Sequence, residues 1–198
     1  MKVFEFEQYS PEWWAARCGL PSASRAGEIL TPTGRASASA DKYMAELVAD
    51  SLGYQEIDED LQSYWMARGS ILEAEARLHY EMASGKDIRQ VGLVTNDDGT
   101  ACCSPDGLID DDTGWEVKCP MPKTHIGYVL GGELPKIYMP QVHFSMAVTG
   151  VKRWHFGSYH PELEPFGIMV EWDSYTDKMA TAVDAFIGKL AVAKAQFS

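Results

Sequence analysis

The feature that most constrains the fold is the stretch 101–120, which reads A-C-C-S-P-D-G-L-I-D-D-D-T-G-W-E-V-K-C-P. Two short apolar runs, Thr100–Cys103 and Trp115–Cys119, flank an acidic turn at Asp110–Gly114. Because Asp, Thr and Gly favour turns between strand-like segments, this pattern predicts a β-hairpin.

Three charged side chains of this hairpin are expected to lie close together. Glu116 and Lys118 are two residues apart on the second strand, so both leave the same face of the sheet. Asp106, at the end of the first strand, is brought beside Glu116 by the hairpin. Adjacent carboxylates repel one another, and a hard divalent metal relieves that repulsion better than one lysine does. The spacing is typical of a metal-dependent phosphodiesterase, whose carboxylates hold Mg²⁺ while the lysine orients or activates a water.

Taken alone, an E-x-K pattern favours an ordinary surface hairpin with one Glu–Lys pair. The complete string S-P-D-G…E-V-K-C-P is far more specific. A calcium-binding EF-hand loop is excluded, because the offsets of the Asp, Gly and closing Glu residues do not fit it.

Length and composition indicate one globular domain over residues 1–198, with 45% hydrophobic and 23% charged residues. No apolar run approaches the ~20 residues that span a bilayer, and Met1–Ser10 lacks the features of a signal peptide. The cysteines show no metal-binding spacing, so we expect reduced thiols in a cytoplasmic protein without membrane contact. They are Cys18, Cys102, Cys103 and Cys119.

The net charge of −12 is not that of a typical nucleic-acid-binding protein. Overall charge governs non-specific attraction, however, and does not decide the chemistry of one site. A DNA enzyme with this composition needs its basic residues gathered on one face, and metal ions to offset its acids.

A candidate phosphate site lies near the N-terminus. Ser10 and Pro11 predict the start of a helix that ends at Arg17, and a second helix begins at Ser22–Arg25 and runs to about Leu30. Backbone N–H groups, hydroxyls and two arginines, Arg17 and Arg25, can together bind a phosphate. A plain capped helix is the alternative.

Other polar residues leave two interpretations open. Arg35, at the tip of a mobile loop over Thr31–Ala40, either contacts a polyanion or is simply solvated. Glu73 is either a charge on the solvated face of a helix or a third metal carboxylate. Gln141 is either a structural amide or a group that orients a phosphate or a water.

The remaining pattern predicts helices at 41–52, 61–84, 124–130, 135–148 and 174–195, and strands at 88–95, 153–159 and 167–172.

This order of elements, with its D…E-x-K hairpin, resembles the PD-(D/E)XK nuclease superfamily. Within it, the chain resembles the phage lambda exonuclease-like viral recombinase family from about Glu12 to the final helix. The matching segments are R-C-G-L-P-S-A-S (17–24), G-S-I-L-E (69–73), A-C-C-S-P-D-G-L (101–108), W-E-V-K-C-P (115–120), L-G-G (130–132) and Y-M-P-Q-V-H-F-S-M (138–146).

The resemblance implies an α/β (α+β) fold with a restriction-endonuclease-like core, a central mixed β-sheet flanked by helices. It implies a processive, Mg²⁺-dependent 5′-to-3′ exonuclease on linear double-stranded DNA, with Mn²⁺ as a possible substitute metal. Such an enzyme releases 5′-mononucleotides and leaves a 3′ overhang for recombination by strand annealing. The expected partners are DNA with a 5′-phosphorylated end, two further copies of the chain in a homotrimeric ring, and a single-strand annealing protein. The expected location is the cytoplasm of a bacterial cell that hosts the phage or prophage.

The family's site residues carry over by position. The metal ligands match Glu73, Asp106, Glu116 and the main-chain carbonyl of Val117, and the catalytic lysine matches Lys118. The 5′-phosphate pocket matches Arg17, Ser24, Ser104 and Gln141. Two positions depart from the pattern: the loop 31–40 carries only Arg35, and the strand-separating residue is matched only loosely by Met66.

Two rival functions stay open at this point. An endonuclease of the same superfamily has the same metal site without end recognition, and it also cuts covalently closed circles. A non-catalytic DNA-binding protein does not need Glu73, Asp106, Glu116 and Lys118 together.

Overall fold

The computed structural model describes residues 1–54 and 63–197. Its helices are α1 (Pro11–Arg17), the 3₁₀ helix η1 (Ala23–Glu28), α2 (Ala40–Ser51), α3 (Ser63–Ser84), α4 (Pro122–Gly131), α5 (Met139–Thr149) and α6 (Ser174–Ala195). Its strands are β1 (Lys2–Phe4), β2 (Ile88–Arg89), β3 (Leu93–Thr95), β4 (Cys102–Cys103), β5 (Gly107–Ile109), β6 (Thr113–Lys118), β7 (Arg153–Ser158) and β8 (Phe166–Glu171).

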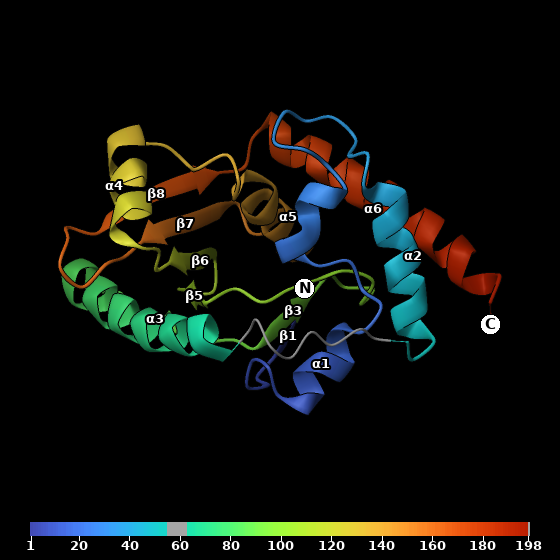
Figure 1. Ribbon diagram of the computed structural model, residues 1–198, viewed down its shortest axis with the longest axis horizontal. Helices are drawn as coiled ribbons and strands as arrows, with labels where there is room; N and C mark the ends of the chain where they lie inside the picture. Colours follow the sequence, from blue (N-terminus) through green and yellow to red (C-terminus); the bar gives the residue numbers. More distant parts are fainter. Residues whose placement is uncertain (55–62, 198) are drawn as a thin grey trace.

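The strands form two sheets with helices packed around them. The larger sheet has the order β2-β5-β6-β7-β8, and the smaller one has the order β1-β3-β4. Strands β6 and β7 run parallel, and the other pairs are antiparallel. Helix α3 runs along the hairpin β5–β6, while α5 lies between the sheets and α6 (Figure 1). The predicted mixed α/β fold with a central mixed sheet is therefore confirmed.

Strand β6 carries apolar and polar side chains on opposite faces. Trp115 and Val117 are buried in a cluster with Ala76 of α3. The alternate residues Glu116 and Lys118 point away from that cluster, and Glu116 contacts Gln141 of α5. The two-residue period of a strand explains this division and places the charged pair on one face, as predicted from the sequence.

The predicted hairpin exists, but its first strand was wrongly assigned to Thr100–Cys103. The partner of β6 is β5, whose Gly107 lies opposite Trp115. Cys102 and Cys103 form β4 in the smaller sheet. The connection is tight because Asp110 and Asp111 adopt the left-handed conformation, with φ of 53° and 58°. Asp110 and Asp111 are the central residues of a turn closed by a 3.3 Å hydrogen bond from the Asp112 N–H to the Ile109 carbonyl, and Asp tolerates positive φ better than most residues.

The predicted strand 88–95 is split between the two sheets. β2 pairs with β5 and β3 pairs with β1, so the chain changes sheets around Gly92. A Cβ atom on Gly92 would lie 1.9 Å from the Phe6 carbonyl oxygen, so only glycine allows this close approach. A continuous apolar run could not reveal that its two ends pair with different strands.

Smaller differences concern the N-terminal half. The second predicted helix is the short 3₁₀ helix η1. The loop 31–40 is held by a hydrogen bond of 2.8 Å from the Thr31 N–H to the Arg35 carbonyl. The first two positions of the predicted helix 61–84 lie outside the described residues.

Among the described residues, no helix combines the length and apolarity needed to cross a bilayer. The four cysteines, which all lie in the described part of the chain, form no disulfide.

Candidate active site

A cavity of about 420 Å³ opens between the N-terminal segment, η1, the β5–β6 hairpin and α5. Residues far apart in the sequence meet in it, because the small sheet and α5 close around the polar face of β6. The sequence-predicted site residues that line it are Arg17, Ser24, Glu73, Ser104, Asp106, Glu116, Lys118 and Gln141.

Glu116 lies at the centre of one polar cluster in this cavity. It is 3% exposed, and its Oε1 accepts hydrogen bonds from Lys118 Nζ at 2.5 Å and from Gln141 Nε2 at 2.7 Å. Burial alone would lower the pKa of Lys118, but the carboxylates of Glu116 and Asp106 outweigh it and raise that pKa above its ordinary value. Lys118 is therefore held as an ammonium ion beside the carboxylates.

Asp106 stands next to this cluster at the entrance to β5. Its Oδ2 accepts a hydrogen bond of 2.8 Å from the backbone N–H of Val117, which ties it to the strand that carries Glu116. Burial and then the charge of Glu116 raise the pKa of Asp106 well above its ordinary value, although Lys118 opposes them. Burial likewise raises the pKa of Glu73, against the influence of Lys118. The predicted approach of Asp106 to Glu116 is thus seen in the structure.

The donor chemistry of this cluster fits a hard divalent cation. Glu73, Asp106 and Glu116 supply carboxylate oxygens to one cavity, and their mutual repulsion is what a bound cation relieves. Among the described residues, however, no three His, Cys, Asp or Glu side chains already lie close enough together to hold an ion. Glu116 instead contacts Lys118 and Gln141. The proposed coordination by the Val117 carbonyl stays a prediction.

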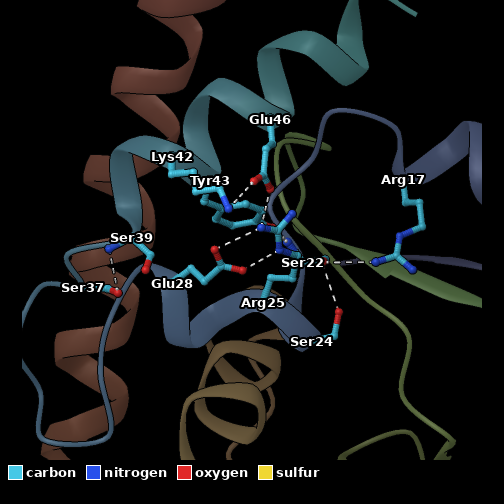
Figure 2. A network of polar contacts seen from close by, with 10 residues as sticks. All are labelled: Arg17, Ser22, Ser24, Arg25, Glu28, Ser37, Ser39, Lys42, Tyr43 and Glu46. Carbon is cyan, nitrogen blue, oxygen red and sulfur yellow. Dashed lines mark hydrogen bonds and ion pairs between the residues drawn. The ribbon is translucent and has the colours of Figure 1, made fainter. Parts of the chain in front are cut away.

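A second cluster in the same cavity is suited to a phosphate. Arg17 Nη2 donates a hydrogen bond of 3.2 Å to Ser22 Oγ, which lies 3.4 Å from Ser24 Oγ (Figure 2). The Arg17 guanidinium stacks on Trp13, 4.2 Å from the ring centroid. Ser104 Oγ accepts a hydrogen bond of 2.9 Å from Trp13 Nε1. A guanidinium and three hydroxyl groups are therefore assembled in one place.

Arg25 does not belong to this cluster, contrary to the expectation from its position. It points away from Arg17 and contacts the carboxylates of Glu28 and Glu46, at 2.6 and 2.5 Å (Figure 2). These two carboxylates raise the pKa of Arg25 against the opposing effect of burial. Because Glu46 comes from α2, only the tertiary structure reveals that this arginine is engaged.

Two more predicted residues are not brought into the cavity. Arg35 is exposed in the loop 31–40 and does not line the cavity. Met66 belongs to α3, but its side chain lies outside the described residues. Their predicted contacts with DNA stay predictions.

The sequence reasoning missed the residues of the N-terminal turn. Gln8 and Tyr9 line the cavity together with Trp13 and Trp14. Gln8 and Tyr9 also line a neighbouring cavity of about 590 Å³, which shares Glu73 and Asp106 with the first. The spacing of Trp13 from Arg17, one helical turn, was the available signal, because side chains four residues apart on a helix are neighbours.

Comparison with protein families places most of this region in one domain type. A model of the YqaJ-like viral recombinase domain matches residues 12–152, which contain all the predicted site residues. No curated protein matches the chain closely in sequence.

Solved structures agree with that match. An alkaline exonuclease (LHK-Exo) from Laribacter hongkongensis is 34% identical, with a TM-score of 0.81 over 95% of this chain and 96% of that one. The same exonuclease in complex with dAMP matches at 33% identity and a TM-score of 0.80, with the same coverage. A phage-related exonuclease from Haemophilus somnus 129PT is 11% identical, with a TM-score of 0.62 over 90% of this chain and 96% of that one, and shares the fold.

Proposed function

Because the chain belongs to the family of YqaJ-like viral recombinase domains, we propose that it is a Mg²⁺-dependent exonuclease that degrades linear double-stranded DNA in the 5′-to-3′ direction. The observation that carries this proposal is that one cavity holds a carboxylate–lysine cluster and an arginine–hydroxyl cluster. The carboxylate–lysine cluster is suited to bind a metal ion and the scissile phosphate. The arginine–hydroxyl cluster is suited to bind a terminal phosphate. Its similarity to an alkaline exonuclease that was crystallised with dAMP supports a mononucleotide product.

End recognition is assigned to the second cluster. Arg17 binds the terminal 5′-phosphate through charge and hydrogen bonds, with Ser24 and Ser104 as further donors. A cluster that accepts a terminal phosphomonoester sets the distance from the end at which the chain is cut. This yields mononucleotides and a defined polarity.

Hydrolysis is assigned to the first cluster. Glu73, Asp106, Glu116 and the carbonyl of Val117 would hold Mg²⁺, or Mn²⁺ in its place, which supplies charge neutralisation at the scissile phosphate. The Lys118 ammonium donates hydrogen bonds that orient the attacking water, and Gln141 holds the Glu116 carboxylate through its amide. Trp13 fixes Ser104 through its indole N–H.

The assembly belongs to the same proposal. A homotrimeric ring would keep DNA in place by enclosing it, which answers the difficulty of a net charge of −12. A single-strand annealing protein would receive the 3′ overhang, in the cytoplasm of the host of a phage or prophage. The membership of the viral recombinase family supports this setting.

Digestion of linear duplex DNA tests the proposal. Substrates labelled at the 5′ or the 3′ end are incubated with and without Mg²⁺, and labelled mononucleotides are measured over time. We expect early release of the 5′ label, dependence on Mg²⁺, and an intact covalently closed circular duplex. Cleavage of the circle would indicate an endonuclease, and release of the 3′ label first would reverse the polarity.

Lys118→Ala is the matched inactive variant. We expect a loss of about 100-fold or more, as for the removal of other groups that position the reacting proton or water. Lys123→Ala, in α4 and outside the cavity, is the control. Full activity of the Lys118→Ala enzyme would refute the assignment.

A further inference from the structure

An aromatic residue occupies a backbone position that normally selects glycine. Tyr9 has φ of 70°, in the left-handed region. It is the third residue of a turn closed by a 3.1 Å hydrogen bond from the Ser10 N–H to the Glu7 carbonyl. Positive φ at this position favours Gly or Asn, and a bulky residue there is strained. Such strain persists where the surroundings impose it, and it concentrates at functional sites.

The surroundings do hold this turn. Gln8 Nε2 donates hydrogen bonds of 3.3 Å to the carbonyls of Val91 and Pro105, which ties the turn to the entrance of the β5–β6 hairpin. Pro105 directly precedes Asp106. The position of Tyr9 is therefore coupled to the backbone that carries one of the proposed metal carboxylates.

The Tyr9 ring stands at the border between the two neighbouring cavities. It lines both of them and is 48% exposed, while its ring centroid lies 5.2 Å from that of Trp13. Glu73 and Asp106 are close enough that their charges, after burial, raise the pKa of Tyr9. The Tyr9 ring thus packs at an angle of 49° against Trp13, and the residue adjoins the carboxylate cluster.

A ring at this place would face the nucleoside of the proposed substrate. The nucleoside between a terminal and a scissile phosphate has to lie between the two polar clusters, beside the rings that line this cavity. Trp13 is only 2% exposed, and its N–H is already bonded to Ser104 and Gly92. Among the described residues lining the catalytic cavity, the large rings that present a free surface are therefore those of Tyr9 and Trp14, the latter 38% exposed.

Trp14 adjoins the other cluster. Its ring centroid lies 5.4 Å from the Arg17 guanidinium, on the side of the terminal phosphate. Tyr9 is the ring beside the carboxylates, where the scissile phosphate is expected.

We propose that Tyr9 is a positioning residue on which the base of the terminal nucleotide stacks, so that the scissile phosphate reaches the carboxylate cluster. The inference rests on the proposed exonuclease function and names a contact that the function itself does not require. Stacking on an aromatic ring accepts every base, which suits an enzyme that degrades DNA of any sequence.

Equilibrium binding measurements distinguish the contact between Tyr9 and the base from the contacts made by the phosphate. Calorimetric titration in the presence of Mg²⁺ compares dAMP with 2-deoxyribose 5-phosphate, which has the same phosphate and no base. We expect Tyr9→Leu to weaken dAMP about tenfold and to leave the affinity for 2-deoxyribose 5-phosphate within twofold. Tyr9→Phe keeps the ring and should retain the preference for dAMP. Tyr54→Leu, which removes a tyrosine that is 74% exposed outside both cavities, is the matched control.

Tyr9→Gly distinguishes stacking from structural support. Glycine adopts positive φ without strain, so the thermal midpoint should not fall below that of the wild type while the preference for dAMP is lost. On linear duplex DNA we expect Tyr9→Gly to raise KM more than it lowers kcat.

Two results would overturn the inference. One is an unchanged preference for dAMP in Tyr9→Leu and Tyr9→Gly. The other is an equal loss of both ligands, which would assign Tyr9 to the phosphate or to local structure. Neither outcome affects the proposed function, which fails independently if the wild-type protein releases no nucleotides from linear duplex DNA.

Discussion

Gln141 of α5 donates a hydrogen bond of 2.7 Å to Oε1 of Glu116, the same oxygen that accepts a hydrogen bond from Lys118. This bond links the helix that follows the hairpin to the carboxylate at the centre of the site. It places Gln141 at the carboxylate cluster of the cavity, in addition to the phosphate pocket assigned to it by the family resemblance.

Removing this amide should disturb catalysis without removing a charged group. We expect Gln141→Leu to reduce hydrolysis roughly 10- to 100-fold, the range found when partners that orient metal ligands are lost. Gln141→Glu should be worse, because a carboxylate facing Glu116 replaces attraction by repulsion. Initial rates on linear duplex DNA measure both, with Gln196→Leu near the C-terminus as control. Wild-type rates for Gln141→Leu would show that the bond has no role in the reaction.

Arg17 should determine the preference for phosphorylated ends. Its guanidinium contacts Ser22 and stacks on Trp13, so it is positioned before DNA binds. We expect Arg17→Ala to reduce the ratio of rates on 5′-phosphate and 5′-hydroxyl ends roughly 10- to 100-fold, the value of a lost charged hydrogen bond. Arg17→Lys should recover only part of it, because an ammonium cannot reproduce the stacked, forked geometry.

The control for that comparison is Arg153→Ala, because Arg153 contacts Asp112 at 2.8 Å on the exposed side of the hairpin. An unaltered end preference in Arg17→Ala would mean that the terminal phosphate binds elsewhere.

Gly114 should be essential for the packing of the sheet. A Cβ atom there would lie 2.1 Å from Cε3 of Trp154, a ring that is fully buried. We expect Gly114→Ala to lower the free energy of unfolding by about 1–3 kcal/mol, the cost of overpacking a core. Gly188→Ala is the opposite case: it meets no atom within 4 Å in helix α6, so it should stabilise by roughly 0.5–1 kcal/mol. Denaturant unfolding of both variants measures the difference, and equal effects would contradict the packing argument.

His155 should make stability depend on pH. Burial lowers the pKa of His155 from 6.5 to about 4, and its Nδ1 has no hydrogen-bond partner within the described residues. Well above pH 6.5 the ring is neutral in both the folded and the unfolded state, so it does not alter the free energy of unfolding. As the pH falls from 6.5 to about 4, His155 binds a proton in the unfolded chain but stays neutral in the folded protein. The folded state therefore loses up to about 3 kcal/mol across that window.

The variant His155→Gln tests this dependence. It should unfold with a shallower pH dependence between pH 6.5 and 4 than the wild type, measured by denaturant titration at several pH values. His160→Gln, a partly exposed histidine of the β7–β8 connection, is the comparison. Identical slopes for His155→Gln and the wild type would exclude His155 as the cause.

Much of the site was predictable because its residues obey short-range rules. Glu116 and Lys118 share a face through the two-residue period of a strand, and the turn residues 110–114 bring Asp106 beside them. The family resemblance added Glu73, Arg17, Ser24, Ser104 and Gln141, which line the same cavity.

Strand pairing was the main error, and it has a physical cause. Thr100–Cys103 and Gly107–Ile109 both read as short apolar segments before the same turn, and local preferences do not choose between them. The choice depends on partners elsewhere: β4 pairs with β3, and the close approach of Gly92 to Phe6 moves the chain between sheets. The same reason explains the error at Arg25: its ion pair with Glu46 of helix α2 depends on the tertiary structure.

The sequence alone therefore determined the chemical groups and the local spacing of the carboxylate–lysine hairpin, because these follow from the geometry of one strand and one turn. Only the tertiary structure decided what surrounds them: Tyr9 is separated from Asp106 by nearly half the chain, yet both line the same two cavities. Contacts of this kind depend on how the sheets and helices pack against one another, and a local sequence pattern does not determine that packing.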